Sequence, residues 1–249
     1  MTNVSKGIKK RNLPTDEEIQ TTLDKANEIK NAYFRKRVRC LICLLKKFGK
    51  RRAEVGSLKL SDLEVKEGFL YVTFTLRKKH KLGLFQYIKH LKKFDDSQQL
   101  NKPLSVLEQE WKLWQQTEQG YKVKEEKRVK KVSLEDKYAK LILEYMEFLN
   151  INHPEVTYLF PSGKAIFDNY WIDNSRPLSG RQLLRLIKPL NHKLWLHLFR
   201  EAKGAEIAQD LGDNIIAVAQ VKETLDLERE TTAWNYIHRY AAQTMKAEP

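Results

Sequence analysis

The pattern of apolar and polar positions predicts helices over most of the chain. Thr15 and Glu18 have the spacing of a capping box, so a helix is expected over residues 13–30. A second helix is expected over 31–49, where the centre is apolar, charged residues cluster at both ends, and Gly49 is placed to end the helix. A helix with an apolar centre and charged ends suits a position in the middle of the core.

A small β-sheet is predicted in the next part of the chain. A short helix over residues 50–64 leads into 68–89, where aromatic and β-branched residues alternate with others, as in a β-hairpin. The basic break around His80 is the expected turn of this hairpin. Residues 127–134 have the pattern of a strand that returns to the same sheet.

Between these strands, residues 90–126 are polar and irregular, and we interpret them as an insertion. Within it, residues 103–116 have a pattern that a helix would satisfy, and Trp111 and Trp114 there are interpreted as packing residues. An amphipathic helix is expected over 135–149.

The C-terminal part, from residue 176 onward, is mostly helical in pattern. The fold class predicted is therefore mainly α with a small antiparallel β-sheet (α+β). The chain has 249 residues, enough to bury a core. We predict a basic N-terminal arm over 1–12, followed by one domain over 13–249 that contains the insertion.

The charge of the chain indicates a polyanionic partner. The sequence has 46 Lys and Arg against 32 Asp and Glu, a formal net charge of +14. Nucleic acid is the first candidate and an anionic membrane surface the second, and binding to phosphates would depend strongly on salt. No stretch approaches the ~18 apolar residues of a membrane span, and the N-terminus has no signal-peptide core. We therefore expect a cytoplasmic protein that associates with DNA and not with membranes.

The two cysteines, Cys40 and Cys43, have the spacing of half a zinc site. No second Cys or His pair follows at a suitable interval, so no metal site is predicted. We interpret both cysteines as small core residues of a buried helix.

Five polar side chains stand out as a set that suits one reaction. His197 and Arg200 are three residues apart in the apolar segment LWLHLFREAKG, which places them one helical turn apart. Arg51 follows a helix end, Lys78 lies at the basic hairpin tip, and Tyr236 lies near the C-terminus. These residue types suit phosphoryl transfer to a tyrosine hydroxyl.

The chemistry of a phosphodiester explains why these residue types suit phosphoryl transfer to a tyrosine. Two guanidinium groups hold the non-bridging oxygens of the transition state with charge-assisted bonds and stay charged at any relevant pH. Tyrosine, with a pKa near ~10, becomes a nucleophile when cations or a base help to remove its proton. A lysine delivers a proton to the departing sugar oxygen, and a histidine contacts the phosphate. A site of this kind needs no metal ion and no other cofactor.

The order and wording of these segments resemble the tyrosine recombinases, also called the phage integrase family. The stretch GKRRAEVGSLKLSDL is similar to the first box of that family, which places the first catalytic arginine at Arg51, a supporting acid at Glu54 and an aspartate at Asp62. HLFR is similar to the H-x-x-R box, which includes His197 and Arg200. VKETLDLERETTAWNYIH aligns without gaps to the segment that ends in the nucleophile, here Tyr236.

Two further stretches, YLFPS and PLSGRQLLRLIK, also resemble the family, so the resemblance extends from about Leu13 to the C-terminus. It implies an integrase-type catalytic domain that cleaves and rejoins DNA strands through a 3′-phosphotyrosine intermediate. It also implies a duplex DNA partner, a homo-oligomer on that DNA, and an origin in a virus, plasmid or other mobile element.

The sequence departs from the family pattern in three places. The position nine residues before the nucleophile, where the family has histidine or tryptophan, is Leu227, and Glu228 is its neighbour. The catalytic lysine is assigned to Lys78, with the alternatives Lys79, Lys81 and Lys127. The separate helical domain that precedes the catalytic domain in integrases has no counterpart in residues 1–12.

Other assignments stay open at this point. Tyr240, four residues after Tyr236, is the alternative nucleophile. A catalytically impaired duplex DNA-binding protein of the same fold is the alternative function, motivated by Leu227. A topoisomerase-like nicking and resealing enzyme would use the same chemistry.

Overall fold

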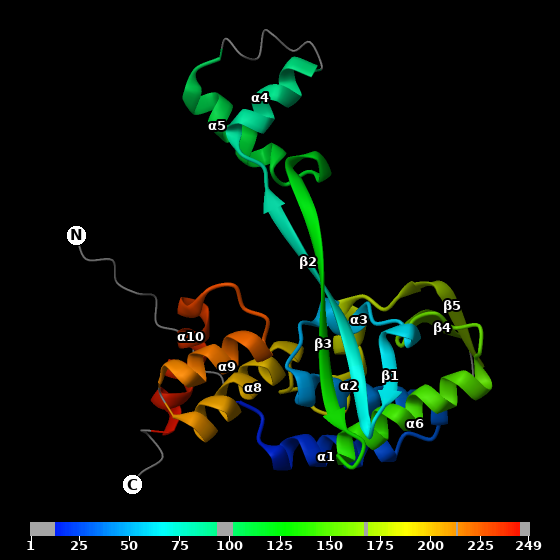
Figure 1. Ribbon diagram of the computed structural model, residues 1–249. Helices are drawn as coiled ribbons and strands as arrows, with labels where there is room; N and C mark the ends of the chain where they lie inside the picture. Colours follow the sequence, from blue (N-terminus) through cyan, green and yellow to red (C-terminus); the bar gives the residue numbers. More distant parts are fainter. Residues whose placement is uncertain (1–12, 94–101, 167–168, 213, 245–249) are drawn as a thin grey trace. The chain divides into compact units, whose positions relative to one another are not determined.

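The computed structural model divides the chain into two compact units (Figure 1). Unit 1 comprises Met1–Phe74 and Val129–Pro249, and unit 2 comprises Thr75–Arg128. The expected N-terminal arm, residues 1–12, lies outside the described residues. The structure describes residues 13–93, 102–166, 169–212 and 214–244.

Unit 1 is mainly helical, and its first helices begin and end where the sequence predicts. The Thr15 hydroxyl accepts a hydrogen bond from the Glu18 amide, and the Glu18 carboxylate accepts one from the Thr15 amide, which confirms the capping box. The described helices of unit 1 are α1 (Asp16–Asn27), α2 (Ala32–Phe48), α3 (Arg52–Gly56), α6 (Lys137–Asn152), α7 (Gly180–Ile187), α8 (Leu196–Leu211), α9 (Ile215–Thr224) and α10 (Glu230–Thr244), together with the short 3-10 helix η1 (Leu60–Asp62).

Helix α2 lies in the middle of the main core, as its apolar centre predicts. It packs against α1, α6, α7 and α8. Cys40 and Cys43 are fully buried in it, and burial raises the pKa of the Cys43 thiol to about 12. Both cysteines are therefore core residues, as predicted, and their thiols stay protonated at neutral pH.

The larger of the two described sheets is three-stranded, with the order β1–β2–β3. Its strands are β1 (Leu63–Lys66), β2 (Phe69–Lys81) and β3 (Tyr121–Ser133). β1 and β2 pair antiparallel, and between them Glu67 and Gly68 have φ of 50° and 79°. Positive φ at both central residues is the geometry of a two-residue hairpin turn whose twist matches the strands.

The hairpin turn predicted near His80 is wrong. Strand β2 continues through His80 to Lys81, and the segment expected as its partner strand forms helix α4 (Leu84–Lys93). The reason is the spacing of Tyr87 and Leu91, which are both buried one turn apart on the same face of α4. A short segment with few apolar residues fits both the strand and the helix periodicity, and packing decides between them.

Unit 2 has a small core of its own. It holds α4, α5 (Leu104–Trp114) and the short η3 (Glu118–Gly120), and α4 packs on α5 through Tyr87, Leu91 and Leu107. The predicted helix within 103–116 is α5. Trp111 and Trp114 pack against this core, as predicted, and the expected insertion, residues 90–126, lies within the unit.

A two-stranded antiparallel sheet in unit 1 was not predicted. It consists of β4 (Pro161–Ile166) and β5 (Asn169–Pro177), with a register shift between Pro161 and Ser162. The sequence PSGKAI of β4 has too few β-branched and aromatic residues to indicate a strand.

The last three helices of unit 1 form a second core. Helices α8, α9 and α10 pack on one another. Partly buried Leu227, Trp234 and Tyr236 pack against this second core. The buried residues that make up the second core are Ile207, Ala208, Ala217, Val218, Val221, Leu225, Ala233 and Ile237.

Candidate functional site

Arg51 is held in place by Glu54 at the start of α3. Arg51 is the residue that precedes the helix, and its backbone N–H donates to Glu54 Oε2 at 3.0 Å. The Arg51 guanidinium donates to Glu54 Oε1 at 2.7 Å. The Glu54 side chain is 5% exposed, whereas that of Arg51 is 50% exposed. The arginine–x–x–glutamate spacing therefore has a physical cause: a buried carboxylate at N3 caps the helix and orients a half-exposed guanidinium.

Arg200 lies on α8 and is almost completely buried. Its guanidinium donates to the carbonyl oxygen of Gly49 at 3.0 Å, and it also donates to the carbonyl oxygen of Leu225. Gly49 ends α2, and Leu225 follows α9. Arg200 therefore ties three segments together, and its position is fixed before any ligand binds.

Gly49 has a conformation that a residue with a side chain rarely adopts. Its φ is +57°, and a Cβ there would lie 2.8 Å from Leu225 and 2.9 Å from Lys203. A side chain at this position would therefore disturb the backbone to which Arg200 donates.

Tyr236 reaches Arg200 from α10. Its phenol lies close enough to the guanidinium to raise the pKa of Arg200. Burial, the largest effect, and then the charge of Arg51 lower it, so that the pKa of Arg200 lies below its ordinary value. An arginine remains charged at neutral pH even so. Since Arg51, Glu54 and Tyr236 all act on Arg200, the structure brings these four residues together.

Gly204 allows the Tyr236 ring to lie close to α8. It follows Arg200 by one helical turn, and a Cβ on Gly204 would lie 3.1 Å from both Cβ and Cδ1 of Tyr236. The sequence analysis did not identify this residue. A glycine inside a helix costs about 1 kcal/mol relative to alanine, so its presence here is a signal of close packing.

His197 lies on the same helix but faces differently. Its side chain is 54% exposed, and its Nε2 lies 3.3 Å from Glu201 Oε1, one turn further along α8. Arg200, three residues away, is buried. The structure therefore pairs His197 with Glu201, and the role of His197 at a phosphate stays a prediction.

The candidate lysines belong to unit 2. Lys78 lies on β2 and forms an ion pair with Glu126 of β3 at 3.3 Å. Lys81 and Lys127 are exposed, and the side chain of Lys79 lies outside what the structure describes. The choice of Lys78 as proton donor stays a prediction.

The turn between α9 and α10 is held by two lysines that the sequence analysis missed. Lys50, which is fully buried, forms an ion pair with Asp226 and donates to the carbonyl oxygen of Thr224 at 3.2 Å. Lys130 of β3 donates to the carbonyl oxygen of Glu223 at 2.9 Å and lies 3.7 Å from Asp226. Burial lowers the pKa of Lys50, and Asp226 opposes this shift. Together with Arg200, three cations fix the turn that leads into the helix of Tyr236.

Leu227 follows this turn and packs against the second core. It is partly buried there, and its amide donates to the carbonyl oxygen of Lys222 at 2.8 Å. Its neighbour Glu228 is exposed. The position at which the family has histidine or tryptophan therefore serves packing in this chain. The alternative nucleophile Tyr240 lies on α10, and its side chain is outside the described part of the chain.

Two wider features of the described residues bear on the site. No helix among them is long and apolar enough to cross a membrane. They also contain no group of three or more His, Cys, Asp or Glu side chains that is placed to hold a metal ion.

The chain resembles solved recombinase structures in fold. No family model and no curated protein matches the sequence. The XerH site-specific recombinase bound to its difH substrate, in a pre-cleavage complex, has a TM-score of 0.57 and 16% identity, over 99% of this chain and 56% of that chain. The post-cleavage complex of XerH with palindromic difH has a TM-score of 0.55 and 15% identity, over 95% and 53% of the two chains. XerA recombinase has a TM-score of 0.54 and 13% identity, over 100% and 67%.

The chain spans little more than half the length of the XerH chains that it matches. At these identities the likeness concerns the fold. With its mainly helical architecture and small antiparallel sheets, the chain has the integrase-type catalytic-domain fold of these recombinases, as predicted.

Proposed function

We propose that this chain is a tyrosine recombinase that cleaves and rejoins the strands of duplex DNA through a 3′-phosphotyrosine intermediate. The observation that carries the proposal is the packing of the Tyr236 ring against α8 at Gly204, one turn from the buried Arg200, whose pKa both Tyr236 and Arg51 shift. The fold shared with XerH and XerA recombinases supports it. The formal net charge of +14 suits a DNA partner.

The two arginines have complementary roles in this proposal. Arg200 is buried and fixed by two carbonyl oxygens, and in this proposal its other N–H groups bind a non-bridging phosphate oxygen. Arg51 is half-exposed, and Glu54 orients it without covering it. Both guanidinium groups would stabilise the charge that develops on the phosphate oxygens in the transition state. Preorganised donors in a partly buried site are more effective than the same donors in water.

The reaction is a transesterification. The phenol oxygen of Tyr236 attacks the phosphorus, the bond to the 5′ oxygen breaks, and Lys78 gives a proton to that oxygen. The phenol proton leaves to solvent, with His197 assisting the transfer. Because the phosphoester bond is kept in the phosphotyrosine link, a 5′-hydroxyl from a second duplex reverses the step without an external energy source. Exchange between two duplexes requires several copies of the chain, so we also propose a homo-oligomer on DNA.

A nicked suicide substrate tests the proposal. A pool of duplexes with randomised sequence and a nick beside the scissile phosphate releases the short 5′-hydroxyl strand after cleavage and traps the covalent adduct. The wild-type chain and Tyr240→Phe are expected to form a protein–DNA adduct that resists denaturing gel electrophoresis, and Tyr236→Phe is not. An adduct with Tyr236→Phe would contradict the assignment, and so would its absence with the wild-type chain.

The second candidate function is a DNA-binding protein of this fold that no longer cleaves DNA. The apolar Leu227, packed in the second core, favours it because this position offers no hydrogen bond to a phosphate. This candidate predicts salt-sensitive binding to duplex DNA and no adduct with the wild-type chain. The suicide substrate therefore separates the two candidates directly.

A further inference from the structure

Helix α4 of unit 2 has two different faces. Its inward face packs on α5 through the buried side chains of Tyr87 and Leu91. Its sequence, LFQYIKHLKK, contains no acidic residue. The basic residues of the helix are therefore not balanced within it.

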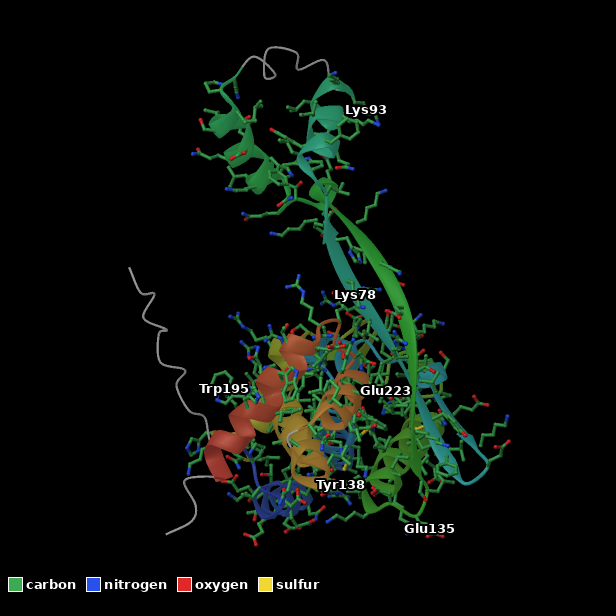
Figure 2. All side chains as sticks on the ribbon, turned by 60° about the vertical axis from the view of Figure 1, so that its left-hand side comes forward. Lys78, Lys93, Glu135, Tyr138, Trp195 and Glu223 are labelled. Carbon is green, nitrogen blue, oxygen red and sulfur yellow. The ribbon has the colours of Figure 1, made fainter. Side chains whose placement is uncertain are left out.

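The opposite face of α4 is exposed and basic. Phe85, Lys89, Lys92 and Lys93 follow one another at helical spacing and are all exposed, Phe85 by 64%. The Lys89 ammonium lies 4.8 Å from the centre of the Phe85 ring. Figure 2 shows Lys93 at the end of this helix. We call these four residues the α4 basic face.

Stability of the helix hairpin does not account for this face. Lys92 and Lys93 lie in the last turn, where they interact favourably with the helix dipole. Lys89 precedes that turn, and Phe85 is exposed although α4 already fills the hairpin core with Tyr87 and Leu91. An exposed aromatic ring that attracts a lysine by a cation–π contact orients the ammonium instead.

The neighbouring helix α5 does not have an exposed basic face. The exposed positions of α5 include the apolar residues Leu104 and Leu113, the acidic residue Glu108 and one lysine, Lys112. The basic charge therefore gathers on one helix of the hairpin. A concentration of like charge on one exposed face is the electrostatic signature of a phosphate-binding surface.

We propose that the α4 basic face binds the phosphate backbone of duplex DNA, which rests on the proposed function. The three ammonium groups lie within about 6 Å of helix rise, so they meet neighbouring phosphates of one strand. Contacts of this kind position a protein on DNA and do not read its sequence. The unit that bears them has a small core of its own, which holds α4 in place.

Salt titration of DNA binding tests the proposal. The triple variant K89Q/K92Q/K93Q is compared with the full-length wild-type chain on a fluorescent duplex. Loss of three phosphate contacts is expected to reduce the slope of log K against log salt by about 2.7, and to weaken binding at low salt by about tenfold or more. Circular dichroism checks that the helix content is kept.

A matched control separates the surface from net charge. The variant K25Q/K30Q/K140Q removes the same charge from exposed lysines of α1, of the segment that follows it, and of α6. It is expected to change the slope by less than one. Equal changes in both variants, or no change in the α4 variant, would overturn the proposal.

Two further measurements fix the ligand and the relation to cleavage. A single-stranded DNA of the same length is expected to lose less affinity than the duplex in the α4 variant; an equal loss would overturn the assignment to duplex DNA. Adduct formation is expected to be unchanged in the control variant K25Q/K30Q/K140Q. If the wild-type chain forms no adduct while the difference in slope persists, the proposed function fails and the α4 surface stands.

Discussion

Arg200 and Gly204 lie one turn apart on α8, and each limits where the Tyr236 ring is able to lie. Arg200 interacts with the phenol, and Gly204 leaves room for the ring against α8. Arg200 is itself fixed by the carbonyl oxygens of Gly49 and Leu225. The position of the phenol therefore depends on backbone geometry in three segments of unit 1.

Gly204→Ala is expected to slow adduct formation while leaving the fold stable. The new Cβ would lie 3.1 Å from the ring of Tyr236, which must move by a few tenths of an ångström relative to Arg200. Small misplacements of reacting groups are costly, and we expect a loss of about tenfold in the rate of adduct formation. The melting temperature is expected to stay the same or rise, because alanine favours the helix. A wild-type rate of adduct formation would show that the reaction tolerates this displacement of the Tyr236 ring.

Sequence analysis predicted Arg51, Glu54, Arg200 and Tyr236, and the structure brings these four together. The signal was the spacing of short boxes, which reflects local constraints such as the cap that Glu54 makes for α3. Gly204 is not predicted from the sequence. It is needed because α8 and α10 approach each other closely at Tyr236, and nothing in the local sequence of α8 indicates that approach.

The turn between α9 and α10 is the second element on which the site depends. Lys50 and Asp226 form a buried ion pair there, and Asp226 has φ of 49°. Lys50 directly precedes Arg51, so the same pair links the segment of the first arginine to the helix of Tyr236. One of many lysines in a strongly basic sequence gives no signal for such a role.

Breaking this ion pair from either side is expected to destabilise the chain. Lys50→Met leaves a buried carboxylate, and Asp226→Asn, which tolerates positive φ, leaves a buried ammonium. Each is expected to cost about 3–5 kcal/mol of unfolding free energy. The double variant K50M/D226N is expected to lose less unfolding free energy than the two single variants lose together. Urea unfolding measures all three, and additive costs would show that the two groups are not coupled.

The N-cap of α6 predicts a dependence of stability on pH. Partial burial raises the pKa of Asp136, but hydrogen bonds from Lys47 and from the amides of Tyr138 and Ala139 outweigh it, so the pKa lies below its ordinary value of 3.8. A depressed carboxyl pKa stabilises the fold above pH 3.8, and this contribution is lost as the pH falls through the folded-state pKa.

Asp136→Asn keeps an N-cap acceptor and removes the charge that faces Lys47. We expect it to lower the unfolding free energy by about 0.5–1 kcal/mol at pH 7, because this partly buried pair is still partly screened by solvent. The difference from the wild-type chain is expected to shrink below pH 3.8. Denaturant titrations at several pH values measure it, and a difference that stays constant with pH would exclude the charge as its source.

Elements with strong periodicity or clear caps were predicted from the sequence, and those decided by packing were not. The start of α1 and the course of α2 follow from Thr15, Glu18 and the apolar centre of α2. The sequence predicts a strand where α4 lies, because the few apolar residues of this segment fit both the strand and the helix periodicity. Contact with α5 decides in favour of a helix. The β4–β5 hairpin lacked strand-forming residues in β4.

The division into two units predicts that unit 1 folds without the helices of unit 2. The two cores of unit 1 contain none of the residues that the structure describes in the segment 82–120. The ends of that segment meet, because the Leu82 amide donates to the carbonyl oxygen of Gly120 at 2.9 Å. Replacing the segment by an Asn-Gly turn between β2 and β3 is therefore sterically compatible with the paired strands.

This shortened chain is expected to fold with a melting temperature close to that of the full-length chain. It is also expected to form the adduct, since Lys78 is retained, while its DNA binding depends less steeply on salt. Calorimetry and the suicide substrate measure the first two properties. A chain that fails to fold would show that unit 1 needs the helices of unit 2.

The most direct test of the account is to identify the residue that becomes linked to DNA. The trapped adduct of the wild-type chain is digested with protease and nuclease, and the modified peptide is sequenced by mass spectrometry. We predict a single peptide from α10 with a 3′-phosphonucleotide on Tyr236. Modification of Tyr240 or of any other residue would contradict the arrangement in which Arg200 and Arg51 present the phosphate to Tyr236.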